Sequence, residues 1–192
     1  MNHLEPDPRV HTPPPPARPT HRWRNDALFF SIALAIVALD QFTKSIVRDH
    51  LALYEQWPEH SVLGIARIIH VANSGAAFGI LQGQTPFLIV TSLVGLVAIV
   101  LYYLYPPMDH GLIRIALGMQ LGGAIGNLID RVRLGEVTDF VDVGGFPTFN
   151  VADASISISI VVVLAFFALR EGDARSNPET STDARPTPAR DD

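Results

Sequence analysis

The sequence contains no cysteine and few charged residues for its length. The absence of cysteine excludes disulfide bonds, thiolate metal sites and a cysteine nucleophile, and leaves the redox compartment open. Of the 192 residues, 17% are charged and 48% are hydrophobic, which is apolar for a soluble domain of this size. The formal charge of −5 says little about partners, because much of the acid lies in the C-terminal tail.

The two ends of the chain lack apolar periodicity. Residues 1–26 include four consecutive prolines, and residues 171–192 are mostly Glu, Asp, Ser, Thr, Pro and Arg. Such segments cannot bury enough apolar surface to offset the entropy of ordering them, so we expect two disordered cytoplasmic tails. No cleaved signal peptide is indicated, because a long polar tail precedes the first apolar segment. Residues 27–170 are expected to form one domain.

Four apolar segments between the tails are long enough to cross a membrane. A membrane helix needs about 20 mostly apolar residues, since about 30 Å of hydrocarbon is crossed at about 1.5 Å per residue. Soluble bundles rarely contain four helices that are apolar on all sides. We therefore predict an all-α membrane protein with four transmembrane helices, at residues 27–47, 85–105, 112–131 and 151–169.

The basic residues predict the orientation of these spans. Four spans put both termini on one side, and that side carries nine basic residues against five on the other. Because cytoplasmic segments carry the excess of Lys and Arg, we expect both termini in the cytoplasm. Residues 48–84 would then form a small β-rich extracytoplasmic platform, with short strands in the Ile- and Val-rich stretch 62–72. Tyr54 and Trp57 suit the membrane interface.

The polar residues within or beside the predicted spans all fall at one membrane face. In chain order they are Asp40, Lys44, Asn73, Asn127, Asp130, Arg131, Asp139 and Asp153. Hydropathy alone does not require this clustering, and ionisable residues in membrane segments usually mark functional sites. The sequence therefore predicts a polar site near the extracytoplasmic ends of the spans.

Several of these residues also have purely structural interpretations. Asp40 and Lys44 share a helix face at i,i+4 spacing, so they could form an ion pair that makes their burial tolerable. Asp130 could cap and neutralise the end of its helix, and Asp139 could be an ordinary interfacial acid. Asp153 is harder to explain in this way, because a lone carboxylate inside an apolar helix is costly and usually functional.

Other residue types in the apolar region indicate packing rather than chemistry. Gly118, Gly122 and Gly126 form two overlapping small-xxx-small steps, which are typical of close helix packing. The histidines are scattered, without i,i+4 partners or a local carboxylate pattern. A metal site built on them is not expected.

Five local strings occur in an order that resembles a known family. They are DQFTK at 40–44, NSGAAFG at 73–79, GGAIGNLIDR at 122–131, VTDF at 137–140 and FNVAD at 149–153. Together with the four spans they resemble the bacterial lipoprotein signal peptidase family, also called signal peptidase II. Each string alone is weak, but all five in order are specific. The resemblance covers residues 27–170.

This resemblance implies an aspartic endopeptidase of the bacterial inner membrane. Such an enzyme removes the signal peptide from prolipoproteins that carry diacylglycerol on a cysteine, and cuts just before that cysteine. By similarity the catalytic pair maps to Asp139 and Asp153. The motif positions that shape the site or contact substrate map to Asp40, Lys44, Asn73, Gly123, Asn127, Asp130, Arg131 and Asn150. The family is also the target of the cyclic peptide antibiotic globomycin, which binds in the same cleft.

Two details remain open in this interpretation. Arg131 could hold a backbone carbonyl of the substrate or brace Asp130. The fairly short loop between the two aspartates, with its Gly144-Gly145 pair and Pro147, could alter a lid over the site.

The reaction can also be argued from the residues. Peptide hydrolysis by two carboxyls needs one ionised, to take a proton from water, and one protonated, to donate to the carbonyl oxygen. Two aspartates a few ångströms apart in a poorly solvated site share one proton and titrate as a pair. No metal, cofactor or covalent intermediate is required. A monomer is sufficient, with prolipoproteins and membrane lipids as partners and no nucleic acid.

A small proton- or ion-coupled membrane carrier is the main alternative, because membrane carboxylates also serve as ion and proton sites. A carrier predicts polar groups near the midplane of the membrane and usually internal repeats. Here the acids cluster at one end, and the halves show no evident repeat. The second alternative is a membrane adaptor that uses the polar face for docking, and it would tolerate Asp139→Asn or Asp153→Asn.

Overall fold

The computed structural model describes residues 21–62, 66–76, 80–105 and 110–176. Within these ranges it contains four helices, which are α1 (His21–His50), α2 (Thr85–Leu104), α3 (Gly111–Leu134) and α4 (Val151–Ser176). The same ranges contain a three-stranded sheet of β1 (Gln56–Val62), β2 (Ala66–Asn73) and β3 (Val137–Asp142). Residues 1–20 and 177–192 of the expected tails lie outside the described residues. Residues 21–26 and 171–176, also assigned to the tails, continue α1 and α4.

The four predicted spans are confirmed. In the described part of the chain, four helices are long and apolar enough to cross a membrane, at Asp26–His50, Thr85–Leu104, Gly111–Leu134 and Val151–Glu171. Local sequence sets some of their ends. Pro86 lies in the first turn of α2, where its fixed φ suits a helix start. Gly135 ends α3 with a φ of 84°, a left-handed conformation that glycine adopts without a steric penalty.

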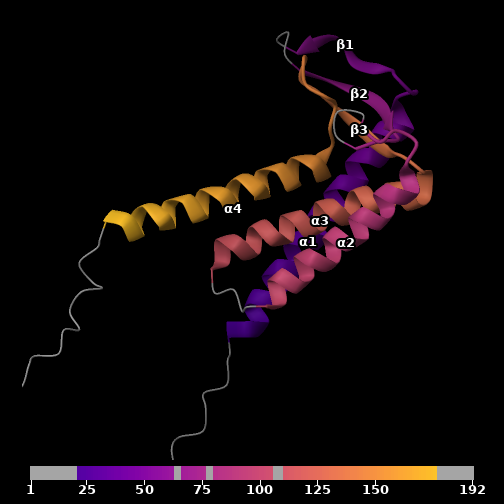
Figure 1. Cartoon of the computed structure of the whole chain (residues 1–192). Coiled ribbons are helices and arrows are strands. Elements are labelled where there is room, and N and C mark those ends of the chain that lie inside the picture. Colours follow the sequence, from indigo (N-terminus) through magenta and orange to yellow (C-terminus); the bar gives the residue numbers. More distant parts are fainter. Residues whose placement is uncertain (1–20, 63–65, 77–79, 106–109, 177–192) are drawn as a thin grey trace, which may run out of the picture.

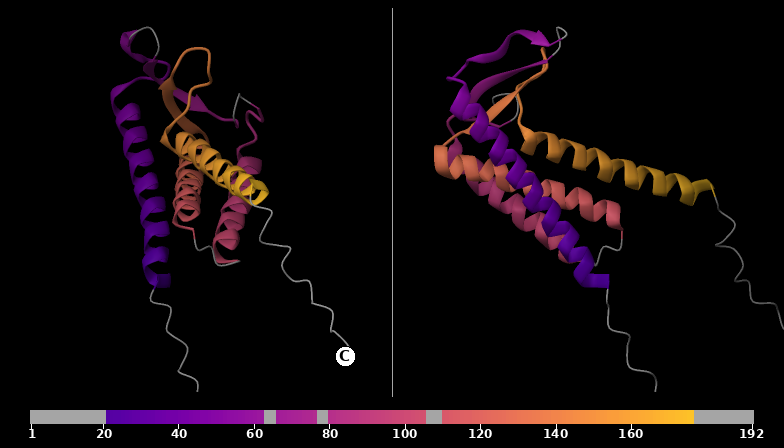
Figure 2. Two further views of the ribbon diagram at one scale, coloured as in Figure 1. Left: turned by 90° about the vertical axis from the view of Figure 1, so that its left-hand side faces the viewer. Right: turned by 180° about the vertical axis from the view of Figure 1, so that it is seen from behind.

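Helix α3 lies at the centre of the bundle and contacts each of the other three helices (Figure 2). In its most apolar stretch 56% of the residues are buried, against 17%, 11% and 17% of the residues in the corresponding stretches of α1, α2 and α4. A Cβ on Gly122 would lie 2.6 Å from the backbone oxygen of Ala33 in α1, and one on Gly123 would lie 2.6 Å from that of Ala152 in α4. The predicted close packing at the glycines is therefore confirmed, and it holds α3 against two helices.

A hydrophobic cluster occupies the end of the bundle away from the sheet. Phe29 of α1 stacks on Tyr103 of α2, with ring centroids 3.9 Å apart and planes at 11°. The Tyr103 hydroxyl donates a hydrogen bond to Asp26. Ile113 and Leu117 of α3 complete the buried contacts. The outward faces of all four helices expose large apolar side chains, as helices in contact with lipid do.

The antiparallel sheet, in the order β1-β2-β3, lies at the end of the bundle where α1 ends and α4 begins (Figure 1). The prediction of short strands within 62–72 is confirmed by the end of β1 and most of β2. Residues 137–142, between the third and fourth predicted spans, form β3, with Asp139 opposite Val71 and Val137 opposite Asn73. This third strand brings Asp139 next to the start of α4.

Candidate active site

Two reciprocal hydrogen bonds cap the N-terminal end of α4. Asn150 is the N-cap residue, and its Oδ1 accepts the backbone N–H of Asp153 at 3.0 Å. In return, the backbone N–H of Asn150 donates to Asp153 Oδ2 at 3.3 Å. This arrangement is a capping box, which satisfies two N–H groups that a helix start otherwise leaves unpaired. It also fixes the Asp153 carboxylate at the first turn of the helix.

Asp139 is held on β3 by two side-chain amides. Asn73 Nδ2 donates to Asp139 Oδ2 at 2.9 Å, and Asn150 Nδ2 donates to Asp139 Oδ1 at 2.7 Å. Asn73 reaches this position because β2 pairs with β3 just beside it. The Asn150 side chain therefore links the two aspartates, since it binds one carboxylate and caps the helix turn that carries the other.

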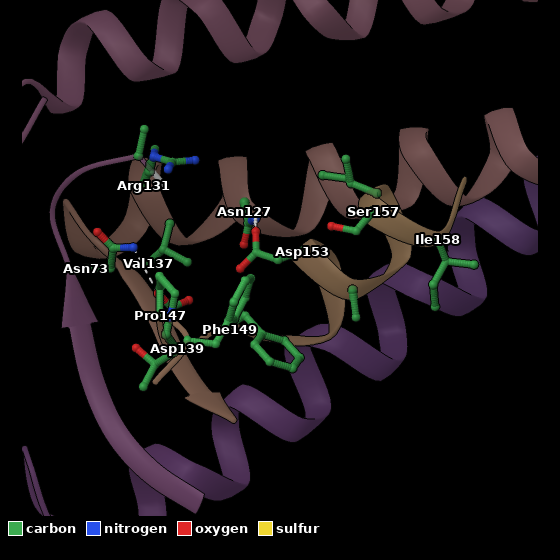
Figure 3. Close-up of a pocket in the computed structure, with 15 residues that line it drawn as sticks. Asn73, Asn127, Arg131, Val137, Asp139, Pro147, Phe149, Asp153, Ser157 and Ile158 are labelled. Atoms are coloured by element: carbon green, nitrogen blue, oxygen red, sulfur yellow. Dashed lines mark hydrogen bonds between the residues drawn. The ribbon is translucent and has the colours of Figure 1, made fainter. Parts of the chain in front are cut away.

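A third amide completes the arrangement on the α3 side. Asn127 Nδ2 donates to Asp153 Oδ1 at 2.7 Å, and Asn150 Nδ2 approaches Asn127 Oδ1 at 3.2 Å. Figure 3 shows Asn73, Asn127, Asp139 and Asp153 around one cavity. Among the ion pairs formed by the described residues, none includes Asp139 or Asp153. In the part of the chain that is described, both carboxyls therefore accept hydrogen bonds from neutral donors only.

The environment of Asp139 favours its protonated form. Burial, together with the neighbouring charge of Asp153, raises the pKa of the Asp139 carboxyl from 3.8 to about 6. Hydrogen bonds from Asn73 and Asn150, and the more distant charge of Lys44, act in the opposite direction but do not cancel the effect of burial. A carboxyl with this pKa can hold or release a proton near neutral pH, as a general acid must.

A second cluster of buried charges lies beside these amides. Lys44 Nζ is 2.9 Å from Asp40 Oδ2 and 3.2 Å from Asp130 Oδ2, and all three side chains are 2% exposed or less. The predicted Asp40–Lys44 ion pair is therefore present. Asp40 Oδ1 also accepts the backbone N–H of Ala152 at 2.9 Å, and Asp130 Oδ2 accepts that of Thr138 at 3.1 Å. The cluster ties α1 and α3 to the segments that carry the two site aspartates.

Two further side chains of α1 belong to this cluster, and the sequence did not single them out. Gln41 Nε2 donates to Asp130 Oδ1 at 3.0 Å and to the backbone oxygen of Gly126 at 3.1 Å. Arg48 Nη1 donates to Thr138 Oγ1 at 2.9 Å and lies 3.8 Å from Asp130 Oδ1. The only hint for Gln41 was its place inside the first of the five strings.

Arg131 and Gly123, which were both named from the resemblance, have different surroundings. Arg131 Nη2 donates to the backbone oxygen of Gly75 at 3.1 Å and lines the cavity, so the structure places it against the 73–76 segment rather than in an ion pair with Asp130. Gly123 faces Ala152 and Ser155 of α4, and a Cβ there would lie 2.6 Å from each. Gly123 thus serves helix packing.

Two cavities meet at Asp139. The first, of about 570 Å³, is lined by apolar side chains of the 146–149 segment and α4 together with both aspartates. The second, of about 590 Å³, lies over the sheet and is lined by Tyr54, Ser74 and Gln82. Both share Asn73, Asp139 and residues 147–148. The loop between the aspartates, which was expected to alter a lid over the site, forms a wall of both cavities.

The described residues contain no group of three or more His, Cys, Asp or Glu side chains placed to hold a metal ion. Their buried side-chain nitrogen and oxygen atoms also all have hydrogen-bond partners. Asp139 and Asp153 both line the apolar cavity, and burial together with the Asp153 charge raises the pKa of the Asp139 carboxyl. Two carboxyls that influence each other's protonation in this way titrate as a pair, as hydrolysis by two aspartates requires.

Comparison with known proteins agrees with this chemistry. Residues 32–169 match the family described as signal peptidase (SPase) II. The chain belongs to this family. A lipoprotein signal peptidase of Dehalococcoides mccartyi is 41% identical over 161 residues, which cover 80% of this chain and 98% of that protein. One of Moorella thermoacetica is 38% identical over 152 residues, covering 78% of this chain and 99% of that protein.

Two solved structures of bacterial membrane enzymes share this fold. A bacterial membrane enzyme with 29% identity superposes with a TM-score of 0.71 over 80% of this chain and 94% of that chain. A second, with 31% identity, gives a TM-score of 0.66 over 72% and 91%. As a member of the signal peptidase II family the chain is a multi-pass membrane peptidase, and the carrier alternative finds no support in these similarities.

Proposed function

We propose that this peptidase cleaves diacylglyceryl-modified prolipoproteins just before the lipidated cysteine, with Asp139 and Asp153 as its catalytic residues. The observation that carries this proposal is the pair of carboxyls bound by neutral amides alone, at the wall of an apolar cavity. Its support is the family, whose curated members are lipoprotein signal peptidases.

The reaction needs one proton shared by the two aspartates. The ionised carboxylate takes a proton from water as the water oxygen bonds to the scissile carbonyl carbon, and the protonated carboxyl donates to the carbonyl oxygen. When the tetrahedral intermediate breaks down, the C–N bond is cleaved and the leaving nitrogen takes up a proton from the dyad. The amides of Asn73, Asn127 and Asn150 keep both carboxyls in place through these transfers.

The cavity suits a substrate that is partly lipid. Phe146, Phe149 and Ile156 give it apolar walls beside the dyad, where acyl chains and signal-peptide side chains lose contact with water. Arg131 lines the same cavity while bound to the Gly75 oxygen. Its remaining guanidinium N–H groups can bind a backbone carbonyl of the substrate.

We place the site at the extracytoplasmic face of the bacterial inner membrane, with both termini in the cytoplasm. The excess of basic residues on the side of the termini supports this orientation. The sheet, which lies at the same end of the bundle as the dyad, would then form the extracytoplasmic platform. Globomycin is expected to bind in the apolar cavity, and a monomer is sufficient because both aspartates come from one chain.

Cleavage of a purified diacylglyceryl-modified prolipoprotein in detergent tests the proposal, with the product read as a gel shift. We expect cleavage by the wild type and a loss of about 10²- to 10⁴-fold in Asp139→Asn and in Asp153→Asn. Asp142→Asn is the matched control, because Asp142 lies on the same strand but pairs with Arg67 instead of facing the cavity. Full activity in both dyad variants would overturn the assignment. No cleavage by folded wild type would reject the function.

A further inference from the structure

We propose that Lys44 is a positioning residue that acts through Asn127: its ammonium fixes the orientation of this amide, and thereby the direction of the hydrogen bonds that both aspartates receive. The inference rests on the proposed function, because it assigns a part in the reaction of Asp139 and Asp153. It concerns a cation that touches neither carboxyl of the dyad.

The first step is the hydrogen bonding of the Lys44 ammonium. This group has three N–H donors and no acceptor. Its three partners are Asp40 Oδ2 at 2.9 Å, Asp130 Oδ2 at 3.2 Å and Asn127 Oδ1 at 2.8 Å. The side chain is fully buried, so water cannot replace any of these partners. Each partner must therefore present an oxygen to Lys44.

The second step is the orientation of Asn127. An amide can be turned by 180° about its last bond, which exchanges its oxygen and nitrogen at little cost in shape. A cation on one side removes this choice, because the amide nitrogen would place its own N–H groups against the ammonium. With Oδ1 held by Lys44, Nδ2 is directed to the other side, where it donates to Asp153 Oδ1 at 2.7 Å.

The third step is that the orientation of Asn127 also determines which hydrogen bond Asp139 receives. Asn150 Nδ2 approaches Asn127 Oδ1 at 3.2 Å, the oxygen that Lys44 also binds, and it donates to Asp139 Oδ1 at 2.7 Å. The Asn150 oxygen is then free to accept the backbone N–H of Asp153 at 3.0 Å. If Asn127 were reversed, its N–H groups would oppose those of Asn150, and an oxygen would face the Asp153 carboxylate.

The alternative is that Lys44 only holds α1 against α3 as part of a neutralised cluster. The charges of Asp40, Asp130, Asp139 and Asp153 act on it, and Arg48 and Arg131 are further cations that interact with Asp130. A purely structural lysine predicts a loss of stability on substitution, with unchanged kcat at the optimal pH in the molecules that fold. A positioning lysine predicts that folded molecules have a lower kcat and a shifted pH profile.

The experiment compares full-length wild type, Lys44→Gln and Arg48→Gln in detergent, with diacylglyceryl-modified prolipoprotein as substrate. Arg48 is the matched control, since it is a second cation beside Asp130 but does not bind Asn127. For Lys44→Gln we expect kcat to fall about 10- to 100-fold with little change in KM. The alkaline limb of its pH profile should move to higher pH, because the Lys44 charge lowers the pKa of Asp139. Arg48→Gln should keep the wild-type profile.

Wild-type kcat and profile in folded Lys44→Gln would overturn the inference, and so would an equal shift in Arg48→Gln. If Lys44→Gln does not fold, Asp40→Asn/Lys44→Gln replaces it, because both members of the ion pair are then neutral and residue 40 keeps an oxygen for the Ala152 N–H. Wild-type behaviour of that double variant would also overturn the inference. Failure of the wild type to cleave would instead reject the proposed function itself.

Discussion

Two pairs of aspartates lie at the same end of the bundle, and their partners differ in charge. Asp40 and Asp130 are bound by the cations Lys44 and Arg48. Asp139 and Asp153 receive their side-chain hydrogen bonds from asparagine amides. A cation neutralises a buried carboxylate permanently, whereas an amide orients it and leaves its charge uncompensated. We therefore expect the first pair to serve the fold and the second to keep a proton that it can exchange.

The largest effect is expected from removing the amide that serves both aspartates. Asn150→Ser keeps a good N-cap residue for α4 but loses the donor to Asp139. We expect kcat to fall about 100-fold, because the two carboxyls lose their common support, while the melting temperature in detergent changes little. Wild-type kcat in this variant would show that the amides are not what distinguishes the second pair.

A cation beside Asp139 should give this aspartate the kind of partner that Asp40 and Asp130 have. Asn73→Lys places a cation next to Asp139, so the pKa of that carboxyl should fall, and the alkaline limb of the cleavage profile should move down by about 1 to 3 pH units. Asn73→Leu removes a hydrogen bond that lowers this pKa, so the alkaline limb of the profile should move to higher pH. Shifts of the same sign in both variants would contradict the assignment.

A moderate effect on stability is expected where a glycine makes room for the first pair. A Cβ on Gly126 would lie 2.5 Å from Asp40 Oδ2, so Gly126→Ala must displace the carboxylate. We expect the free energy of unfolding to fall by about 1–3 kcal/mol, measured as a lower melting temperature in detergent. Gly95→Ala in α2 is the control, since nothing lies within 4 Å of its Cβ position. Gly95→Ala should be neutral or stabilising, because alanine has a higher helix propensity than glycine, so an equal loss in both variants would contradict the displacement of Asp40.

The smallest effect is expected at Asp142, which has a partner open to solvent. The Gly144 N–H and Arg67 lower the pKa of Asp142, but Arg67 is 40% exposed and its charge is screened by water. Asp142→Asn should cost less than about 1 kcal/mol at neutral pH. Because the pKa is lowered, this stabilisation is present above the ordinary range of aspartate and is lost as the pH falls through it. Melting curves of wild type and variant should therefore converge in acid.

The spans and their polar ends could be predicted because they depend on local composition. An uncharged stretch such as 85–104 needs no knowledge of its neighbours to be recognised as a membrane helix. The ion pair of Asp40 and Lys44 followed from their spacing alone. The capping box was also readable, since Asn150 and Asp153 precede an apolar run at N-cap spacing, but the string was interpreted only through its family resemblance.

The rest of the fold and of the site depends on how segments that are distant in the sequence pack together. Gln41 binds Asp130 across 89 positions, and nothing near either residue indicates that contact. Strand β3 is six residues long and buried on both faces except at Val141, so it lacks the alternation by which short strands are recognised. The roles of the site residues remain predictions, and the variants above test them.

The position of Asp139 between two unlike cavities has a further consequence. One cavity has apolar walls and the other polar ones, and the aspartate is part of the boundary between them. We therefore expect the lipid portion of a substrate and the attacking water to arrive from different phases, with local concentrations that follow from partitioning. On that expectation, the rate of hydrolysis depends on how deeply the bilayer covers this boundary, and membrane thickness affects catalysis without any change in the chain.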